Sequence, residues 1–292
     1  MPSSEKNFIS VGIPTYNSSN YLNECIKSVI SKKRINQIII SDDKSKENEI
    51  EKIEEIIKKF KDNSNKDIRL IKNNTNLGAF ANKLKLIKES TNKFVYILDS
   101  DNIAGKNLDL IISKIFKTNN NSNYLFQPNI MYQFSQYPNI AKFISNFQKK
   151  YSVKFLPNDT SLDIKDIKES LILNPGSYEL KNFVESVDDL NSNRAEDFLI
   201  DKWIFWILNC GNFIVDKYRM IEIAEEGLNL DRKLLSIDAV VFSYLWLNSG
   251  SKIKILDNFF HHHRKRKDSV SFIEREDSLY ATKYFIKTIL KV

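Results

Sequence analysis

Two aspartates, Asp99 and Asp101, stand one residue apart around Ser100, directly after the apolar run Phe94 to Leu98. Two carboxylates at this spacing can face one divalent cation whose other ligands are the oxygens of a diphosphate. Aspartates after a strand can also simply cap the following helix, and an isolated D-x-D pattern favours that plainer interpretation. The surrounding sequence therefore has to decide between the two.

Three further polar segments also follow short apolar runs near the start of the chain. They are Pro14, Thr15, Tyr16 and Asn17; then Asp42, Asp43, Lys44 and Ser45; and then Asn73 to Gly78. Each segment alone fits an ordinary turn, because Asn, Asp, Ser and Gly are the common turn formers. In an open parallel sheet, however, ligands bind outside the carboxyl ends of the strands. Four such segments in succession favour a ligand site with a hard cation at Asp99 and Asp101.

Asp43, Asn76 and Gly78 each fit such a site, and each also has a plainer interpretation. The Asp43 carboxylate can accept protons from the imide or amine edge of a nucleobase and so select the base, or it can cap the helix that follows. Asn76 and Gly78 fit a close backbone approach to a ligand, or a turn in which Gly78 takes a positive φ. The residues themselves leave these alternatives open.

The elements that position these residues can be predicted from periodicity in the first 120 residues, where short apolar runs alternate with stretches of helical spacing. The predicted strands are Phe8 to Ile13, Gln37 to Ser41, Ile68 to Lys72 and Phe94 to Leu98. An amphipathic helix is predicted from Lys46 to Lys61, and another is marked by Phe80, Leu84 and Ile87. The pattern predicts an α/β fold with a mainly parallel sheet.

The second half of the chain is less regular. The polar segment Thr118 to Asn123 divides a ligand-binding half, residues 1–120, from residues 121–292. Periodicity is weak from 124 to 200, and no topology is predicted there. Two apolar, tryptophan-containing segments, Asp201 to Ile214 and Ile237 to Leu247, are predicted core elements, the second of them a helix.

Composition limits the class of protein. The 292 residues are 42% hydrophobic and 28% charged, which is typical of soluble globular proteins. No apolar stretch reaches the roughly 20 residues of a membrane helix, and the start lacks the pattern of a signal peptide, which predicts a cytoplasmic protein. Cys25 and Cys210 are expected to be core thiols, and they offer no disulfide framework. The net charge of +7 favours anionic partners.

The four polar segments and their strands resemble the successive signatures of family 2 glycosyltransferases with the GT-A fold. The matching stretches are FISVGIPTYN, IIISDDKS, NNTNLGAFAN and FVYILDSD, in the family's order and spacing. The resemblance implies a Rossmann-like sheet flanked by helices, followed by an acceptor-side region. It implies a nucleotide held by Thr15, Tyr16, Asn17 and Asp43. The ribose and the metal-bridged diphosphate then lie at Asp99 and Asp101, and the predicted donor-binding set also includes Pro14, Asn76, Gly78 and Ser100.

The C-terminal half resembles the same family more loosely, through Gly211-Asn212, Ser236-Ile237-Asp238 and His261 to Arg264. Inverting members usually carry Glu-Asp where this chain has Ile237-Asp238. The aspartate of that pair commonly deprotonates the acceptor hydroxyl, so the resemblance assigns this base to Asp238. Asp197, in the pair Glu196-Asp197, is the rival candidate.

All three histidines are consecutive, at 261 to 263, and Arg264, Lys265, Arg266 and Lys267 follow them. The run fits a solvated basic loop, or a metal ligand with neighbouring cations on a leaving diphosphate. A histidine near the end of the catalytic domain often completes the metal site of related GT-A enzymes. His263 is therefore predicted to join Asp99 and Asp101, with His261 as the alternative because residues two apart on an extended segment share a face.

The resemblance implies a metal-dependent, inverting glycosyltransferase that uses Mn²⁺ or Mg²⁺. Its predicted donor is a nucleotide-diphosphate sugar, taken as a UDP-sugar, and its acceptor is a glycan, a lipid-linked sugar or a protein. The chain has neither the Q-x-x-R-W sequence nor the membrane helices of the family's processive synthases, so a non-processive enzyme is predicted. The segment 124–200 is expected to choose the acceptor. The cytoplasmic prediction leaves open a peripheral position at the inner face of a membrane.

Two other classes of function remain as alternatives. A catalytically degenerate GT-A protein is suggested by the missing glutamate before Asp238. A basic nucleic-acid or membrane-binding module is suggested by the net charge and the HHHRKRK run, but it leaves the aspartates at the strand ends unexplained, and nucleic acid is not an expected partner. A nucleotidyltransferase usually needs a Gly-rich basic loop after the first strand, where this chain has PTYNSSN.

Overall fold

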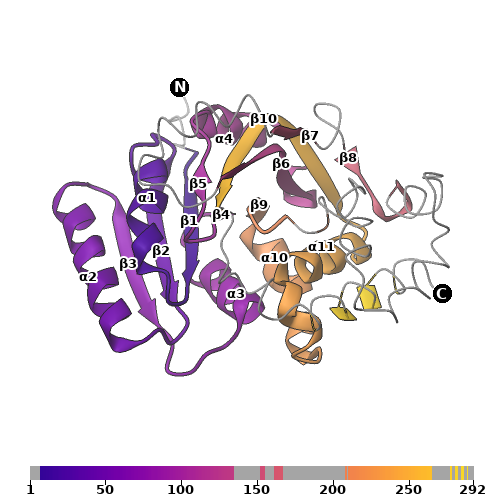
Figure 1. Ribbon diagram of the computed structural model, residues 1–292. Coiled ribbons are helices and arrows are strands. Elements are labelled where there is room, and N and C mark those ends of the chain that lie inside the picture. Colours follow the sequence, from indigo (N-terminus) through magenta and orange to yellow (C-terminus); the bar gives the residue numbers. More distant parts are fainter. Residues whose placement is uncertain are drawn as a thin grey trace.

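The computed structural model describes residues 7–134, 152–154, 161–166, 208 and 210–264, and the separate positions 277, 280, 281, 284, 285 and 288. Within these residues the strands form one ten-stranded sheet with helices on both faces (Figure 1). Its main path runs in the order β3-β2-β1-β4-β9-β6-β10-β5. The predicted α/β architecture, with a central sheet flanked by helices, is confirmed.

The first four strands form a parallel unit within the sheet. They are β1 (Ile9–Thr15), β2 (Ile35–Asp42), β3 (Asp67–Lys72) and β4 (Phe94–Ile97). Each neighbouring pair among them is parallel, and each strand lies where the sequence predicts it. Parallel strands that are covered on both faces have nearly continuous apolar sequences, as Ile38 to Ile40 illustrate, and this is why the apolar runs identify them.

The second half of the chain extends the same sheet from β4 onward. The added strands are β9 (Phe213–Asp216), β6 (Tyr124–Phe134) and β10 (Lys252–Arg264), and the two-residue β5 (Ile103–Ala104) of the first half lies at the edge beyond β10. β9 is antiparallel to β4 and β6, whereas β10 is parallel to β6 and antiparallel to β5. Two short strands, β7 (Ser152–Lys154) and β8 (Ser161–Leu162), pair with β6 and β10. Strands from both predicted halves therefore belong to one sheet.

The proposed boundary at 118–123 includes a short 3₁₀ helix, η1 (Asn121–Asn123), between the last helix of the first half and β6. The division of function between residues 1–120 and 121–292 stays a prediction. In the weakly patterned region from 124 to 200, the described residues are β6 to β8 and residues 163–166. The rest of that region, including Glu196 and Asp197, lies outside the described residues.

Helices cover the two faces of the sheet in two groups. One group comprises α1 (Ser19–Ile30), α2 (Glu47–Asp62) and α4 (Leu108–Lys117), which share an apolar cluster with one side of the strands. The other comprises α3 (Ala79–Glu89), α10 (Lys217–Ala224) and α11 (Asp238–Asn248). Helices α2, α3 and α11 confirm the predicted ones, whereas α1, α4 and α10 are not among the predictions.

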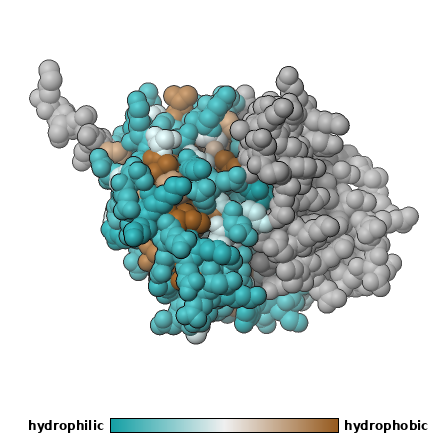
Figure 2. Space-filling view, turned by 60° about the vertical axis from the view of Figure 1, so that its left-hand side comes forward, coloured by the Kyte–Doolittle hydropathy of each residue, from teal (hydrophilic) through white to brown (hydrophobic). Residues whose placement is uncertain are grey.

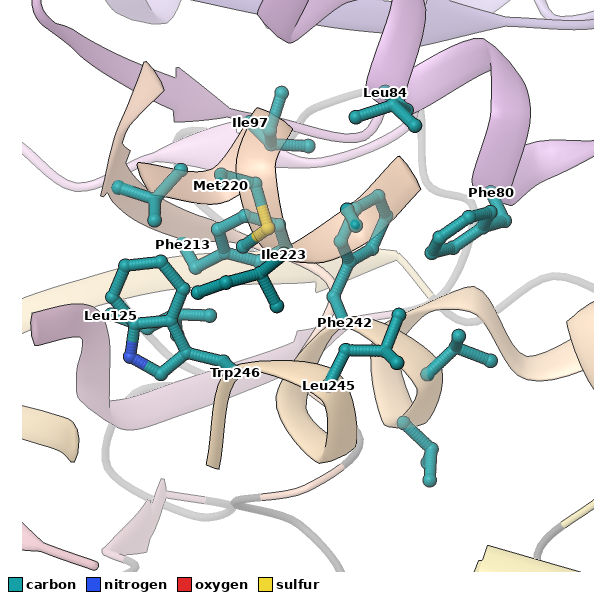
Figure 3. Packing of buried hydrophobic residues seen from close by; sticks show 14 of the residues in the cluster. Phe80, Leu84, Ile97, Leu125, Phe213, Met220, Ile223, Phe242, Leu245 and Trp246 are labelled. Carbon is teal, nitrogen blue, oxygen red and sulfur yellow. The ribbon is translucent and has the colours of Figure 1, made fainter. Parts of the chain in front are cut away.

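Aromatic packing fixes α3 against α11 (Figure 3). The ring centres of Phe80 on α3 and Phe242 on α11 are 4.5 Å apart, and Phe242 also lies 5.5 Å from Phe213 of β9. Burying side chains of this size contributes roughly 1.5–3 kcal/mol each. The indole of Trp246 donates to the carbonyl of Lys252, so α11 is also anchored to β10. These contacts hold α3 and α11 in fixed positions relative to each other and to the sheet.

The side of the molecule that carries α2 and β3 is mainly hydrophilic, with hydrophobic residues in small separate patches (Figure 2). The solvent-facing residues of α2 are largely Glu and Lys, while Ile53, Ile57 and Phe60 face the sheet. Among the described residues, no helix combines the length and the apolar character that crossing a bilayer requires.

Candidate active site

The predicted polar segments meet at the carboxyl ends of the four parallel strands. The amide of Asp43 donates to the carbonyl of Thr15, which joins the ends of β1 and β2. The amide of Asn73 donates to Asp42 and so joins β2 to β3, and the amide of Leu98 donates to Gly12 of β1. These bonds place all four predicted segments at one edge of the sheet, as the parallel topology requires.

The turn after β1 is held by the turn after β2. Asn17 has a positive φ of 48°, its amide donates to Ser45 Oγ at 2.8 Å, and its side-chain oxygen accepts from the amide of Lys46 at 3.0 Å. Ser45 is itself fixed by Asp42, which accepts from both its amide and its hydroxyl. Because the backbone around it is fixed, Tyr16 presents its side chain at the surface, with 49% of the residue exposed.

A chain of buried hydroxyl groups connects the β1 turn to the D-x-D segment. Thr15 Oγ1 lies 2.8 Å from Ser18 Oγ, which lies 2.7 Å from Ser100 Oγ. All three residues are buried. The side chains of Thr15 and Ser100, which were predicted to bind a ligand, therefore bond inward to α1. In this structure they fix the relative positions of two turns.

The Asp43 carboxylate organises the loop between β3 and α3. It accepts hydrogen bonds from the amides of Leu77 (2.8 Å) and Gly78 (2.9 Å) and from the side-chain amide of Asn73 (3.0 Å). A carboxylate offers about four lone-pair positions, so one remains for a further donor such as a nucleobase imide. Sequence alone predicted neither this loop contact nor its three donors.

Asn76 and Gly78 complete that loop. The Asn76 side chain donates to the carbonyl of Asp43 at 3.1 Å and accepts from the amide of Gly78 at 3.1 Å. Gly78 has φ 84° and ψ 160°, a backbone region that essentially only glycine occupies. Its position, directly before α3, lets the chain turn from the Asp43 contact into the helix.

The D-x-D segment is held from two sides. The amide of Asp99 donates to Asn212 Oδ1 at 2.9 Å. On the other side, Arg264 at the end of β10 donates through Nε to the carbonyl of Asp101 at 3.2 Å and through its amide to Asn102 Oδ1 at 3.1 Å. The backbone that carries Asp99 and Asp101 is thus fixed by segments from the second half of the chain.

A buried lysine, Lys83 of α3, joins the two predicted catalytic regions. Its Nζ lies 2.7 Å from Asp99 Oδ1 and 2.7 Å from Oδ2 of Asp238, the first residue of α11. Only 5% of the Lys83 side chain is exposed. Burial alone would lower the pKa of Lys83, but the carboxylates of Asp238 and Asp99 outweigh it and raise that pKa. The lysine is therefore a permanent cation between the predicted base and the predicted diphosphate site.

Gly211 allows a segment from the second half of the chain to lie close to Asp99 and Lys83. A Cβ atom at position 211 would lie 2.9 Å from Asp99 Oδ2 and 3.4 Å from Lys83 Nζ. The first distance is shorter than a carbon and an oxygen tolerate without movement. The absence of a side chain at 211 therefore lets the backbone before Asn212 lie directly against Asp99.

The histidine run is part of β10 and not a solvated loop. His261 pairs in register with Ala104 of β5 and with Met131 of β6, and both His261 and His262 are buried. Burial, with a smaller effect from the neighbouring histidines, holds the pKa of His261 well below its usual value, and burial lowers the pKa of His262 to about 4. Residues 261–264 belong to β10 and complete the sheet, so the basic-loop interpretation is wrong for these four residues.

His263 and Arg264 have different environments. The rings of His261 and His263 are 6.2 Å apart, which confirms that they share a face of the strand. Arg264 is buried, forms a 2.5 Å ion pair with Glu24 of α1, and places its guanidinium carbon 4.7 Å from the centre of the Tyr21 ring. Its guanidinium therefore contacts α1, and Lys265 to Lys267 lie outside the described residues.

Among the described residues, Asp99 and Asp101 are the candidates to bind a divalent cation. No three His, Cys, Asp or Glu side chains among the described residues come close enough together to form a metal site, so His263 is not brought into one with the two aspartates. Mg²⁺ is usually bound by one or two carboxylates together with substrate phosphates and water, without a dedicated protein cage. The D-x-D pair fits that mode, and His263 as a ligand stays a prediction.

Lys83 is the site residue that the sequence analysis missed, although a signal was present. Phe80, Leu84 and Ile87 define the apolar stripe of α3, and Lys83 falls inside this stripe at the i+3 position from Phe80. A lysine in the buried stripe of an amphipathic helix needs a partner, because such side chains are almost never fully buried unpaired. The periodicity therefore marks a buried charge, but it cannot name the carboxylates that bind it.

Comparison with known proteins gives a family match. The model of the family described as Glycosyl transferase family 2 matches residues 10–164, more than half of the chain. The uncharacterized glycosyltransferase MJ1057 of Methanocaldococcus jannaschii is 32% identical over 151 residues, which cover 45% of this chain and 50% of that protein. The match to this relative therefore spans half of its length.

Two further similarities extend over more of the chain. The UDP-Glc:alpha-D-GlcNAc-diphosphoundecaprenol beta-1,3-glucosyltransferase WfgD of Escherichia coli is 26% identical over 73% of this chain and 77% of that protein. The crystal structure of S. aureus TarS 1-349 in complex with UDP-GlcNAc has a TM-score of 0.56 at 15% identity, and the match covers 97% of this chain and 70% of the TarS chain. At this identity the likeness shows a shared fold.

Proposed function

The chain belongs to glycosyl transferase family 2, and on this premise we propose that it moves one sugar from a UDP-sugar to an acceptor hydroxyl, with inversion at the anomeric carbon. One observation carries the proposal. Asp99, of the predicted diphosphate site, and Asp238, the predicted base, contact the same lysine nitrogen at 2.7 Å each. The two functions that an inverting transfer needs are therefore adjacent.

The donor is assigned to the edge formed by the turns after β1, β2 and β4. The exposed ring of Tyr16 offers a surface for the base, and the Asp43 carboxylate keeps one acceptor position for an imide proton. Uracil is the base we propose, because the names of WfgD and of the TarS complex both contain a UDP-sugar. Pro14, Thr15, Asn17, Asn76, Gly78 and Ser100 shape this edge.

The diphosphate is assigned to Asp99 and Asp101 together with Mn²⁺ or Mg²⁺. A divalent cation bound there would balance the charge that develops on the diphosphate as it leaves. The chain's own contribution is to hold the two carboxylates in place, through Asn212 on one side and Arg264 on the other. Fixing groups where charge develops before the reaction begins is the main electrostatic contribution of an enzyme.

Asp238 is proposed to take the proton of the acceptor hydroxyl. As the proton moves to its carboxylate, the acceptor oxygen forms a bond to the anomeric carbon, and the bond from that carbon to the diphosphate oxygen breaks with its electron pair. Because attack comes from the face opposite the leaving group, the configuration inverts. Asp238 opens α11, and a helix N-terminus stabilises a carboxylate.

The acceptor is proposed to be a lipid-linked sugar, which would place the enzyme at a membrane surface without crossing it. The name of WfgD supports this choice, since it gives an α-D-GlcNAc linked to diphosphoundecaprenol as that enzyme's acceptor. The net charge of +7 also suits a surface with anionic headgroups.

Release of UDP from UDP-glucose and UDP-N-acetylglucosamine, with Mn²⁺ and a GlcNAc-diphospholipid, tests the proposal. Turnover with one donor, retained nucleotide binding and lost turnover in Asp238→Asn would support it. Unchanged turnover in that variant would move the base elsewhere, first to Asp197. A folded protein that binds UDP but never turns over any donor would favour the degenerate alternative.

A further inference from the structure

We propose that Lys83 is a positioning residue, which holds the Asp238 carboxylate at a fixed place and orientation relative to the donor diphosphate. The inference rests on the proposed function and adds a residue that neither the D-x-D segment nor the base assignment includes. It starts from the location of a charge inside the apolar stripe of α3.

Protein stability gives little reason for a lysine at this position. Phe80, Leu84 and Ile87 of the same stripe are buried in the apolar cluster that α3 shares with α11. Buried ion pairs are often no more stabilising than apolar residues of similar volume, because desolvation offsets the attraction. Met, which suits a helix, would fill the stripe if packing were the only requirement. We therefore attribute the presence of a lysine here to its contacts with the carboxylates of Asp99 and Asp238.

The geometry couples those carboxylates through one atom. Asp99 Oδ1 and Asp238 Oδ2 each lie 2.7 Å from Lys83 Nζ, so the two oxygens cannot be farther apart than twice that distance. The Asp99 and Asp238 side chains are 29% and 17% exposed, which leaves each carboxylate accessible from the solvent side. With Oδ2 held by the ammonium, Oδ1 of Asp238 is left for the acceptor hydroxyl.

The lysine can position Asp238 because its own helix is fixed. Phe80 and Phe242 pack at 4.5 Å and tie α3 to the helix that begins at Asp238 (Figure 3). On the sheet side, a Cβ at Gly12 would lie 3.2 Å from Leu86 Cβ, so α3 lies closely against β1. Lys83 thus connects two packed elements at the point where donor and acceptor meet. A displacement of about 1 Å in such an arrangement can cost roughly 100-fold in rate.

The test uses UDP release from the UDP-sugar that wild type prefers, with Mn²⁺ and water or the GlcNAc-diphospholipid as acceptor. Lys83→Met is expected to lower kcat about 100-fold, while KM changes much less. Lys88→Met is the matched control, because Lys88 lies on the same helix and pairs with Glu225 at 2.8 Å, yet its side chain is 39% exposed. The control is expected to keep wild-type kcat and KM.

A double-mutant cycle shows whether Lys83 acts through Asp238. The variant with both Lys83→Met and Asp238→Asn is expected to be no slower than Asp238→Asn alone, since the lysine then has no base to position. Independent, multiplying losses would overturn the proposal, and so would wild-type kcat in Lys83→Met. A KM increase with unchanged kcat would likewise overturn it, because the lysine would then serve donor binding only.

A second variant and the wild-type control separate failure of the Lys83 proposal from failure of folding or of the proposed function. If Lys83→Met fails to fold, Lys83→Arg keeps the charge with a different shape; it is expected to retain UDP binding and lose at least tenfold in kcat, and wild-type kcat would refute the role. If wild type itself neither binds UDP with Mn²⁺ nor releases UDP, the proposed function fails. Failure of the Lys83 proposal alone appears as an active wild type whose Lys83 variants are equally active.

Discussion

Arg264 Nε donates a hydrogen bond of 3.2 Å to the carbonyl oxygen of Asp101, although 163 positions separate the two residues. The contact ties the last residue of β10 to the turn that carries both aspartates of the D-x-D segment. The Arg264 guanidinium is anchored at the same time by Glu24 of α1. The shape of the proposed diphosphate site therefore depends on a residue of the last described strand.

Replacing Arg264 by Met should weaken both folding and ligand binding. The variant loses hydrogen bonds in which the donor is charged, and because Glu24 is partly exposed we expect the free energy of unfolding to fall by only about 2 kcal/mol. The response to UDP with Mn²⁺ should fall as well, since the Asp101 turn is released. Arg219→Met, which breaks an exposed pair with Glu222, is the control. Equal effects of both substitutions on UDP binding would show that Arg264 does not shape the site.

Replacing Gly211 by Ala tests the close approach to Asp99. The new Cβ would lie 2.9 Å from Asp99 Oδ2, so either the backbone or the carboxylate must move, at a cost of roughly 1–3 kcal/mol. The metal-dependent response to UDP should be largely lost. Gly250→Ala is the control, because Gly250 has a φ of 80° and open space around it, so that variant loses stability without touching the site. An intact UDP response in Gly211→Ala would contradict the assignment of Asp99.

Replacing Asp43 by Asn should release the loop between β3 and α3. The carboxylate accepts from two backbone amides and one side-chain amide, and an Asn side chain would turn a donor toward one of them. We expect the free energy of unfolding to fall by about 2 kcal/mol and nucleotide binding to be lost, as measured by urea unfolding and by calorimetry with UDP. Asp62→Asn, at the exposed end of α2, should change stability by less than about 0.5 kcal/mol.

The parallel strands and their terminal polar residues could be predicted because both are local in sequence. Buried parallel strands have nearly continuous apolar sequences, and parallel topology by itself brings their carboxyl ends together. Helix α1 was also predictable, because its buried apolar residues Leu22, Cys25, Ile26 and Val29 recur at the helical spacing i, i+3, i+4 and i+7, although no helix was predicted there.

The contacts that complete the site could not be predicted, because each joins residues far apart in sequence. Lys83 was recognisable as a charge in an apolar stripe, but its pairing with Asp238 depends on how α3 packs against α11. From sequence alone the histidine run fits either a basic loop or a metal ligand, since its neighbours in β5 and β6 are more than 120 positions away. The sequence pattern does not specify that pairing.

The most direct measurement is thermal unfolding with UDP, GDP and CDP, each with and without Mn²⁺, in wild type and in Asp101→Ala. A ligand that binds only the native state raises the unfolding midpoint. We expect a rise with UDP that requires Mn²⁺ and disappears in Asp101→Ala, with little response to GDP or CDP. No rise with any nucleotide in a folded wild-type protein would contradict it, and so would a UDP response that Asp101→Ala leaves unchanged.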